Sequence, residues 1–277
     1  MRVEPSGEAC GATVSGIDLA GELGGELVRE IRAAWMQHRV LAFCGQAMDD
    51  DALERFTLAM GGFGEDPFFA PIPGRRNIAA IRREADETSP LFAENWHSDW
   101  SFLAQPPAGT CLLAIDVPTA GGDTLFADQH TAWDALPDHR QRELQGLIAI
   151  HSARYAYAPQ GTYGDNDQGR SMDIRASESA LATQRHPLIA THPETGRRGF
   201  FSTLGYIIGI EGMSDAEAIP LLRELHEWQS RDEFVHRRRW EPGMLVMWDN
   251  RAVLHKATGG YEGYRRELHR TTIAAAS

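Results

Sequence analysis

The residues with the clearest chemical potential lie in the segment Asn95–Trp100, where His97 and Asp99 are two positions apart. On an extended segment, side chains at positions i and i+2 point to the same face. An imidazole nitrogen and a carboxylate oxygen would therefore lie side by side. Together they supply two of the three ligands in the two-histidine, one-carboxylate set, which suits non-haem Fe(II) and leaves coordination positions open for oxygen chemistry.

A third ligand is expected from one of the other histidines, of which most should be ordinary core or surface residues. His255 differs from the others because it lies just past an apolar run and a turn, in the segment Trp248–Lys256. It is followed, after a further turn-rich stretch, by Arg266 and Arg270. We therefore take His255 as the candidate third ligand.

Two arginines are expected to face the interior in the segment Arg265–Ile273. If this segment is a strand, Arg266 and Arg270 lie on the same face as the apolar Leu268. A buried arginine needs an anionic partner, because an uncompensated buried charge costs several kcal/mol. No acidic residue on that face supplies one, so the partner is either a carboxylate from another part of the fold or an anionic small molecule. The two Cα atoms would lie roughly 13 Å apart, so the side chains would address opposite ends of a small site.

Taken in order along the chain, these residues resemble a known family. The order is His97-x-Asp99, Gly122-Asp123-Thr124, Trp248-Asp249-Asn250-Arg251 with His255, and then Arg266 and Arg270. The ordered set is similar to that of the taurine and aryloxyalkanoate dioxygenases, which are Fe(II)- and 2-oxoglutarate-dependent oxygenases on a double-stranded β-helix (jelly-roll) fold. The resemblance covers nearly the whole chain, from the glycine-rich start to Thr272.

The resemblance implies that His97, Asp99 and His255 bind Fe(II) and form the catalytic centre. Three protein ligands leave three octahedral positions, of which 2-oxoglutarate would take two and O2 the third. The carboxylate of Asp99 favours hydroxylation, because related halogenases have a small residue there that leaves room for chloride.

The resemblance also implies positions for the co-substrate and the substrate. Thr124 and Arg266 would hold the far carboxylate of 2-oxoglutarate, whose near carboxylate and keto oxygen chelate the metal. Arg270 would lie near the metal-bound end of the co-substrate and near an anionic group of the substrate. Tyr206 falls at an aromatic position of the substrate pocket.

The residues around the substrate depart from the taurine enzyme. Where that enzyme has a histidine, a tyrosine and an asparagine, this chain offers Ala93 and an apolar loop that contains Phe69. Polar contacts to a small amine are missing, so taurine itself is not expected. Arg270 still implies an anion, and we expect a larger or more apolar carboxylate, sulfonate or sulfate ester, with aryloxyalkanoates among the candidates.

Two other functions explain part of the pattern. A zinc-dependent hydrolase can also use two histidines and a carboxylate, but it leaves Thr124 and Arg266 unexplained. A binding protein on a degenerate oxygenase scaffold would not need to keep all three metal ligands, which this chain has. The leading hypothesis is therefore a dioxygenase that hydroxylates a small anionic substrate and releases succinate and CO2.

The composition narrows the remaining classes. The net charge of −12 argues against a surface for nucleic acid or acidic membranes, which would need clustered positive charge. Lys256 is the only lysine, so Schiff-base catalysis has a single candidate amine and is not expected. Cys10, Cys44 and Cys111 have no Cys-x-x-Cys spacing, which is typical of buried thiols in a reducing compartment.

The chain contains no apolar run long enough for a signal peptide or a membrane span. We therefore expect a cytoplasmic enzyme with no nucleic-acid or membrane partner. We also expect a homo-oligomer, either a dimer or a tetramer.

Regular elements must carry these residues, and hydrophobic periodicity indicates where they lie. Helices are expected over residues 26–38, 49–60, 131–136, 137–147 and onward from Ser214, which begins a Ser-x-x-Glu capping box. Thr57 interrupts the apolar face of the second of these helices. Strands are expected within 9–18 and over 40–43, 77–82, 110–117, 125–127, 188–192, 199–202, 244–248, 252–254 and 268–273.

Two segments lack any periodicity. The segment Gly61–Pro73 is rich in glycine, proline and phenylalanine and is expected to be a loop. The segment Tyr155–Ser171 is either a lid over the site or a disordered surface insertion. Many short strands with helices in the insertions predict a mainly β fold with a jelly-roll core, as one domain over residues 1–277.

Overall fold

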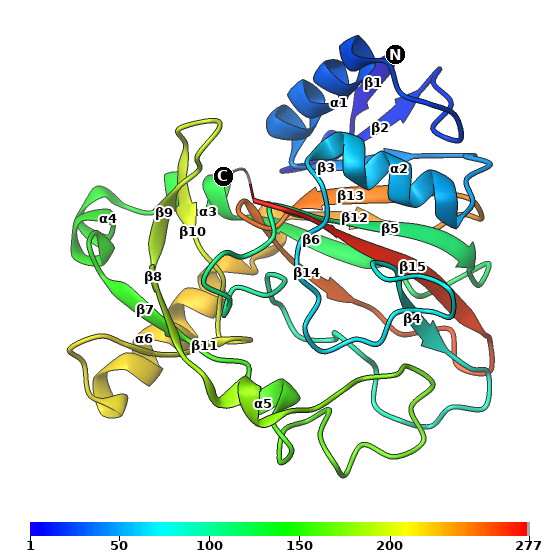
Figure 1. Cartoon of the computed structure of the whole chain (residues 1–277). Helices are drawn as coiled ribbons and strands as arrows, with labels where there is room; N and C mark the ends of the chain where they lie inside the picture. The colour runs from blue at the N-terminus through cyan, green and yellow to red at the C-terminus, as the bar shows by residue number, and fades with distance from the viewer. Residues whose placement is uncertain (276–277) are drawn as a thin grey trace.

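The computed structural model describes residues 1–275, and a seven-stranded sheet forms its centre (Figure 1). The strand order is β1-β2-β3-β13-β5-β15-β4, in which β2 and β3 are parallel and the other neighbours are antiparallel. Its strands are β1 (Arg2–Pro5), β2 (Ala12–Ser15), β3 (Val40–Phe43), β4 (Ala79–Arg83), β5 (Gly109–Asp116), β13 (Leu245–Asp249) and β15 (Arg266–Ile273).

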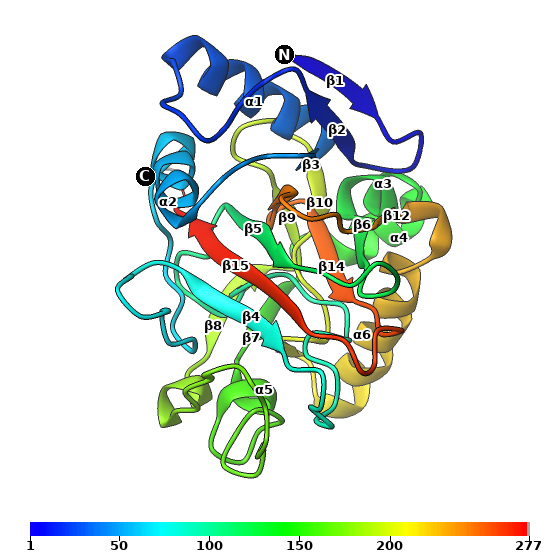
Figure 2. The ribbon, with the colours of Figure 1, turned by 90° about the vertical axis from the view of Figure 1, so that its right-hand side faces the viewer.

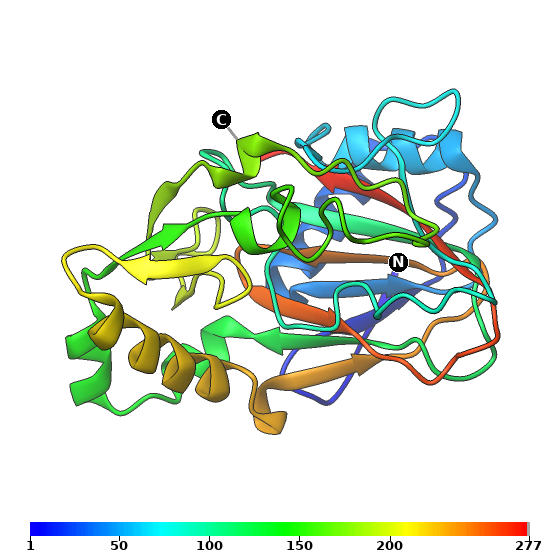
Figure 3. The same cartoon turned by 90° about the horizontal axis from the view of Figure 1, so that it is seen from below.

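A smaller antiparallel sheet faces this large sheet, and the view from below separates the two layers (Figure 3). Its order is β12-β6-β14, formed by β12 (Val235–Arg238), β6 (Thr124–Asp128) and β14 (Val253–Ala257). One apolar cluster joins Leu112, Trp248 and Leu268 of the large sheet with Phe126 and Val253 of the small one. Two facing sheets of this kind, antiparallel apart from the β2–β3 pair, form a jelly roll, so the predicted fold class is confirmed.

Two helices cover the other face of the large sheet (Figures 1 and 2). They are α1 (Gly25–His38) and α2 (Asp50–Met60). Trp35 of α1 and Phe56 of α2 pack with Leu245 and Met247 of β13, whereas Trp248 of the same strand faces the small sheet. Successive strand residues point to opposite faces, so a strand buried on both sides is apolar at nearly every position.

The start of α2 and its single polar core residue explain how this helix holds its position. The Asp49 carboxylate accepts a hydrogen bond of 2.8 Å from the Ala52 N–H, which caps the helix. Thr57, which interrupts the apolar face, is fully buried. Its hydroxyl lies 2.8 Å from the Leu53 carbonyl oxygen and 2.7 Å from the Thr271 hydroxyl, so its polar atom is satisfied within the core.

The remaining helices and strands pack at one end of the jelly roll (Figure 1). They are α3 (Gln129–Asp134), α4 (Asp138–Leu144), β7 (Ile148–His151), β8 (Gln184–Pro187), β9 (Ile189–Thr191), β10 (Arg198–Phe200), β11 (Ile207–Ile210), α6 (Asp215–Gln229) and the 3-10 turns η1 (Glu178–Leu181) and η2 (Asp232–Phe234). The predicted capping box of Ser214 and Glu217 is present at the start of α6. The predicted strand pair is also present, as β9 and β10.

Several predicted boundaries were wrong, and five strands were not predicted: β1, β7, β8, β11 and β12. The helix expected over residues 137–147 ends at Leu144, and β7 begins four residues later. The strands β7, β8, β11 and β12 have no clear alternation in sequence. Each becomes a strand through pairing with a distant segment, as β8 does with β7.

The segment Tyr155–Ser171 begins in the short helix α5 (Arg154–Tyr157) and continues as an irregular loop. Just beyond it, the Asp173 carbonyl oxygen accepts a 3.0 Å hydrogen bond from the Ala70 N–H, and the Arg175 N–H donates a 2.8 Å bond to the Phe68 carbonyl oxygen. The chain just after the loop is therefore bound to the Gly61–Pro73 loop, and Tyr157 at its start stacks on Phe68 with ring centroids 4.7 Å apart. No helix within residues 1–275 has the length and apolar character needed to cross a membrane.

Candidate metal and co-substrate site

Backbone pairing brings His97 and His255 together. The segment that carries His97 forms an isolated antiparallel bridge to β14 at His255. The His97 N–H donates a 3.1 Å hydrogen bond to the His255 carbonyl oxygen, and the His255 N–H donates a 2.8 Å bond in return. The two imidazole rings consequently lie with their centroids 4.2 Å apart.

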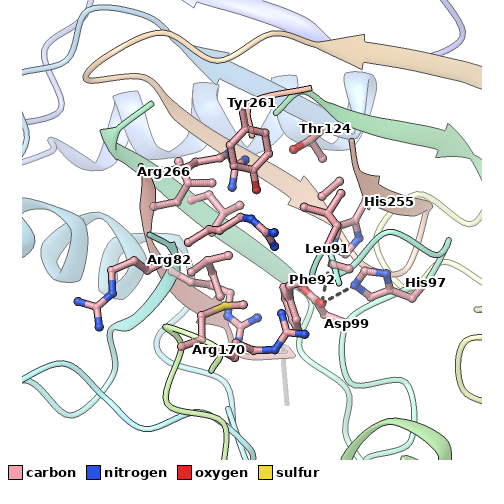
Figure 4. Close-up of a pocket in the computed structure, with 18 of the residues that line it drawn as sticks. Arg82, Leu91, Phe92, His97, Asp99, Thr124, Arg170, His255, Tyr261 and Arg266 are labelled. Atoms are coloured by element: carbon pink, nitrogen blue, oxygen red, sulfur yellow. Dashed lines mark ion pairs between the residues drawn. The ribbon is translucent and has the colours of Figure 1, made fainter. Parts of the chain in front are cut away.

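Asp99 completes a cluster that we call the metal triad: His97, Asp99 and His255. One ligand atom from each residue lies within 4.8 Å of the others. Oδ1 of Asp99 is 3.6 Å from Nε2 of His97 and 3.6 Å from Nε2 of His255. Three donor atoms at this spacing fit around one cation with metal–ligand distances of about 2.0–2.2 Å. The triad lies on one wall of a pocket (Figure 4), so the other side of such a cation would face open space.

Hydrogen bonds beyond the triad hold Asp99 in place. Its Oδ2 accepts a 2.6 Å hydrogen bond from the Thr110 hydroxyl on β5. That hydroxyl accepts a 3.0 Å bond from Nδ2 of Asn250, and Oδ1 of Asn250 accepts a 2.9 Å bond from Nε1 of Trp248. This chain of bonds gives Trp248 and Asn250 a role in positioning Asp99.

A hydrogen bond at Nδ1 also orients the imidazole ring of His97. Its Nδ1 lies 2.8 Å from the Asn95 carbonyl oxygen. A carbonyl only accepts, so Nδ1 carries the proton and Nε2 presents its lone pair toward Asp99 and the pocket. His255 has no such partner, since its buried Nδ1 makes no hydrogen bond to any residue within 1–275.

Burial and neighbouring charges set the protonation states that metal binding requires. Burial tends to raise the pKa of Asp99, but His255, His97 and Arg270 outweigh it and hold that pKa well below its usual range. Burial, with help from His97, lowers the pKa of His255 to about 3. The carboxylate is therefore ionised and this imidazole neutral at neutral pH, the forms in which both groups bind a metal.

Five arginines line the same pocket, and one of them lacks an acidic partner. The four with a carboxylate oxygen within 4.0 Å are Arg82 with Glu84, Arg83 with Glu87, Arg170 with Asp167, and Arg270 with Asp66. Arg266 has no such partner within residues 1–275, although it is buried. It lies across the pocket from the metal triad in Figure 4.

The surroundings of Arg266 fix its position but do not neutralise it. One Nη atom donates a 3.2 Å hydrogen bond to the Gly122 carbonyl oxygen, and the buried Nε has no partner within residues 1–275. Burial lowers the pKa of Arg266, against opposing effects of Tyr261 and Asp123. A buried guanidinium with free donors is suited to a carboxylate ligand, which is the small-molecule alternative that the sequence left open.

Thr124 and Gly122 shape this end of the pocket. Thr124 lines the pocket, and its Oγ1 accepts a 3.0 Å hydrogen bond from Nε1 of Trp240. The hydroxyl proton of Thr124 is thus free to donate to a ligand. Gly122 has φ +68°, and a Cβ there would lie 3.1 Å from Nε of Arg266. A larger residue would press on the guanidinium.

Arg270 pairs with a carboxylate from another part of the fold, which is the other alternative that the sequence left open. Nη2 of Arg270 lies 2.8 and 2.7 Å from the two carboxylate oxygens of Asp66, and Nε lies 3.2 Å from one of them. Asp66 belongs to the irregular loop between α2 and β4. Burial alone would lower the pKa of Arg270, but Asp66 and Asp99 raise it above its usual value.

The residues expected to bind substrate do not all line the same pocket. Ala93 lines the pocket beside the triad. Tyr206 lines a second cavity of about 300 Å³, which shares Phe92, Ala93 and His97 with the first, and its ring centroid is 6.2 Å from that of His97. Phe69 does not line the first pocket. It stacks behind the Arg270 guanidinium at 4.2 Å.

Sequence reasoning missed the residues that join the two loops over the pocket. Glu87 accepts a 2.9 Å hydrogen bond from the Ser171 N–H, and Arg82 donates a 3.0 Å bond to the Ser171 carbonyl oxygen. Arg170 and Met172, on either side of Ser171, line the pocket. The adjacent arginines 82 and 83 at the end of a predicted strand were the available signal, but nothing in the sequence pairs them with a segment so distant.

The chain is similar in sequence and structure to known proteins. Residues 2–272 match the family described as "Taurine catabolism dioxygenase TauD, TfdA family". The chain is 37% identical over 276 residues to the alpha-ketoglutarate-dependent 2,4-dichlorophenoxyacetate dioxygenase of Cupriavidus pinatubonensis, covering 94% of this chain and 93% of that protein. It is 30% identical over 277 residues to the alpha-ketoglutarate-dependent sulfate ester dioxygenase of Pseudomonas putida, covering 99% and 89%. The crystal structure of AAD-2 in complex with Mn(II) and N-oxalylglycine matches with a TM-score of 0.78 and 29% identity, covering 100% of this chain and 98% of that one.

Proposed function

Because the chain belongs to the taurine catabolism dioxygenase TauD, TfdA family, we propose that its pocket binds and hydroxylates a small anionic organic substrate. The enzyme is a 2-oxoglutarate-dependent non-haem iron dioxygenase that uses Fe(II), 2-oxoglutarate and O2. One observation carries the assignment of the site. The metal triad and Arg266, the lining arginine without a carboxylate partner, face the same pocket.

The residues at the two ends of the pocket have different proposed roles, metal binding at one end and co-substrate binding at the other. His97, Asp99 and His255 would hold Fe(II), which when bound supplies the oxidation of 2-oxoglutarate to succinate and CO2 and the hydroxylation of the substrate. Thr110 keeps Oδ2 of Asp99 occupied, so Oδ1 is left to the metal. Arg266, with the free hydroxyl proton of Thr124, would hold the far carboxylate of 2-oxoglutarate through charge-assisted hydrogen bonds.

The walls of the pocket favour a partly apolar substrate. Ile81, Leu91, Phe92 and Met172 line it between the triad and the arginines. Such walls exclude water and leave room for an alkyl or aryl group. With Arg270 as the candidate anion ligand, and with relatives named for 2,4-dichlorophenoxyacetate and for sulfate esters, we propose an aryloxyalkanoate-like carboxylate, a sulfonate or a sulfate ester. Ala93 and Tyr206 would contact its apolar part.

The same proposal covers the chain as a whole. We place residues 1–277 in one catalytic domain, since the family match spans residues 2–272. A reducing compartment, the cytoplasm, fits the free thiols of Cys10, Cys44 and Cys111. We propose a homo-oligomer, either a dimer or a tetramer, which light scattering after size exclusion would test. The Tyr155–Ser171 loop is proposed as a lid because its Arg170 lines the first pocket and its Tyr155 and Tyr163 line the second cavity.

One pair of measurements tests the function. With Fe(II) and 2-oxoglutarate in the absence of O2, the protein should develop a weak visible charge-transfer band. Under air it should form succinate, faster when 2,4-dichlorophenoxyacetate, an alkyl sulfate or an alkanesulfonate is added. A protein that shows no band and forms no succinate would not be an oxygenase. Cleavage of a substrate that requires Zn²⁺ but neither 2-oxoglutarate nor O2 would instead identify a hydrolase.

A further inference from the structure

The ion pair between Asp66 and Arg270 lies where the proposed function requires a free cation. Both carboxylate oxygens of Asp66 contact the Nε and Nη2 edge of Arg270, at 2.7 to 3.2 Å. This edge can bind a carboxylate through two parallel hydrogen bonds. The Arg270 side chain is 5% exposed and that of Asp66 is 21% exposed. An anionic substrate therefore meets an arginine that already holds a carboxylate.

Arg270 itself cannot turn away to meet another anion. Its guanidinium lies 4.2 Å from the ring centroid of Phe69 and 5.1 Å from that of Trp100. Both aromatic residues are buried, and β15 is paired on both sides, with β4 and β5. Of the two members of the ion pair, Asp66 is the one with room to move.

A third cavity, separate from the two described above, leaves room for the Asp66 carboxylate to move. This cavity of about 390 Å³ is lined by Asp66, Arg76 and Asn77, among others of the same loop. Arg76 is exposed and has no carboxylate oxygen within 4.0 Å among residues 1–275. A carboxylate that leaves Arg270 could therefore pair with another guanidinium on the far side of its own loop. Figure 2 shows this loop, between α2 and β4, beside β15.

Hydrogen bonds fix the backbone on both sides of Asp66, so its carboxylate would leave Arg270 by rotation of the side chain alone. The Gly64 N–H donates a 3.0 Å hydrogen bond to the Thr272 carbonyl oxygen, and the Ala70 N–H donates one of 3.0 Å to the Asp173 carbonyl oxygen. Asp66 lies between these two anchors. Burial raises the pKa of Asp66, and Arg270 opposes that rise, which makes a second cationic partner important for the displaced carboxylate.

We propose that Asp66 is a displaceable counter-ion that determines specificity: the anionic group of the substrate replaces it on Arg270, and its carboxylate turns into the adjoining cavity toward Arg76. The inference rests on the proposed function, because it requires an anionic substrate held by Arg270. It predicts that uncharged analogues fail to displace Asp66. It also predicts that weakly coordinating anions compete poorly, since each must replace a bidentate pair.

The first test is Asp66→Asn, which keeps the shape of the side chain and removes the charge. The probes are 2,4-dichlorophenoxyacetate, an alkyl sulfate and an alkanesulfonate, each compared with an uncharged amide or alcohol of similar shape. For whichever anion the wild-type protein turns over fastest, we expect the variant to lower KM about tenfold, the worth of one charged hydrogen-bonded contact. The KM for 2-oxoglutarate and for the uncharged analogue should change less than twofold. Glu65→Gln, the exposed neighbouring carboxylate, is the matched control and should leave every KM unchanged.

The second test removes the proposed alternative partner. Arg76→Gln changes an exposed position and should raise KM for the anion several-fold. In combination with Asp66→Asn it should have no further effect on KM, because the effects of mutations at two interacting residues are not additive. Equal KM values for the anion in the wild type and in Asp66→Asn would overturn the inference while leaving the oxygenase intact. An equal fall in KM for the anion and its uncharged analogue would overturn it too. If neither protein forms succinate in response to any anion, the proposed substrate class fails and the inference fails with it.

Discussion

The hydroxyl of Thr110 donates a 2.6 Å hydrogen bond to Oδ2 of Asp99. This single contact decides which oxygen of the carboxylate faces the two imidazoles. Oδ2 is occupied within the core, and Oδ1 points to the histidine nitrogens at 3.6 Å. A monodentate carboxylate leaves more of the metal's coordination sphere open than a bidentate one, so Thr110 matters to the reaction without touching the metal.

Replacing Thr110 with valine should therefore weaken metal binding without unfolding the protein. Loss of an outer hydrogen bond of this kind typically lowers metal affinity or activity 10- to 100-fold. Titration of Fe(II) into the 2-oxoglutarate complex, followed by the visible band, measures the affinity. Thr271→Val is the control, since this residue is also a buried threonine of the same sheet and its hydroxyl bonds to Thr57. It should lose stability but keep the affinity, and equal effects of the two variants would refute the positioning role.

Arg266→Gln should raise KM for 2-oxoglutarate about tenfold to a hundredfold. The estimate is the 1.5–3 kcal/mol that a charged hydrogen bond contributes. Arg265→Gln is the matched control, because Arg265 directly precedes β15, is partly exposed and pairs with Glu84, Asp116 and Glu267. Steady-state succinate formation at varied 2-oxoglutarate concentration distinguishes them. An unchanged KM in Arg266→Gln would mean that the co-substrate lies elsewhere.

Removal of the metal should destabilise the protein, because the triad joins two segments that are distant in sequence. A metal present at a hundred times its dissociation constant adds about 2.7 kcal/mol to the free energy of unfolding. Urea unfolding with Mn(II) and with a chelator should show a difference of this order in the wild type. His255→Ala should abolish the difference, whereas His139→Ala, an exposed histidine on α4, should preserve it.

Stability should fall as the pH is lowered from about 6.5, owing to a histidine outside the metal site. Burial, with help from His186, lowers the pKa of His151 from 6.5 to about 3. Between these values the unfolded chain binds a proton that the folded chain does not, so acid favours unfolding by up to about 1.4 kcal/mol per pH unit. Between pH 6.5 and pH 5 the loss is about 1.6 kcal/mol. His151→Gln should reduce this loss, and His139→Gln should not. A slope that is the same in all three proteins would contradict the assignment.

The sequence was most informative where local spacing dictates direction. The two-residue spacing of His97 and Asp99 and the alternation along Arg266–Ile273 both follow from backbone geometry, and the structure brings these residues to one pocket. The capping box at Ser214 likewise predicts the start of α6 from contacts within one turn. Each of these predictions needs only neighbouring residues.

The features that the sequence did not predict depend on contacts between distant segments. Asp66 meets Arg270 across 204 positions, and a loop without periodicity gives no sign of which strand it will contact. Strand β8 consists of Gln184–Pro187, a polar run with a terminal proline, and it is a strand only because β7 offers it hydrogen-bond partners. Phe69, which we expected to contact the substrate, packs behind Arg270, with its ring centroid 4.2 Å from the guanidinium.

The backbone bridge between His97 and His255 also bears on how the protein is made. The two residues are separated by more than half of the chain, so a chain growing on the ribosome presents His97 and Asp99 long before His255 exists. Until β14 is synthesised, the first histidine has neither its fellow ligand nor its hydrogen-bonding partner. A nascent chain can therefore offer only an incomplete site to iron. The oxidising centre is therefore assembled late in synthesis, together with β14 and β15, the strands that complete the two sheets around it.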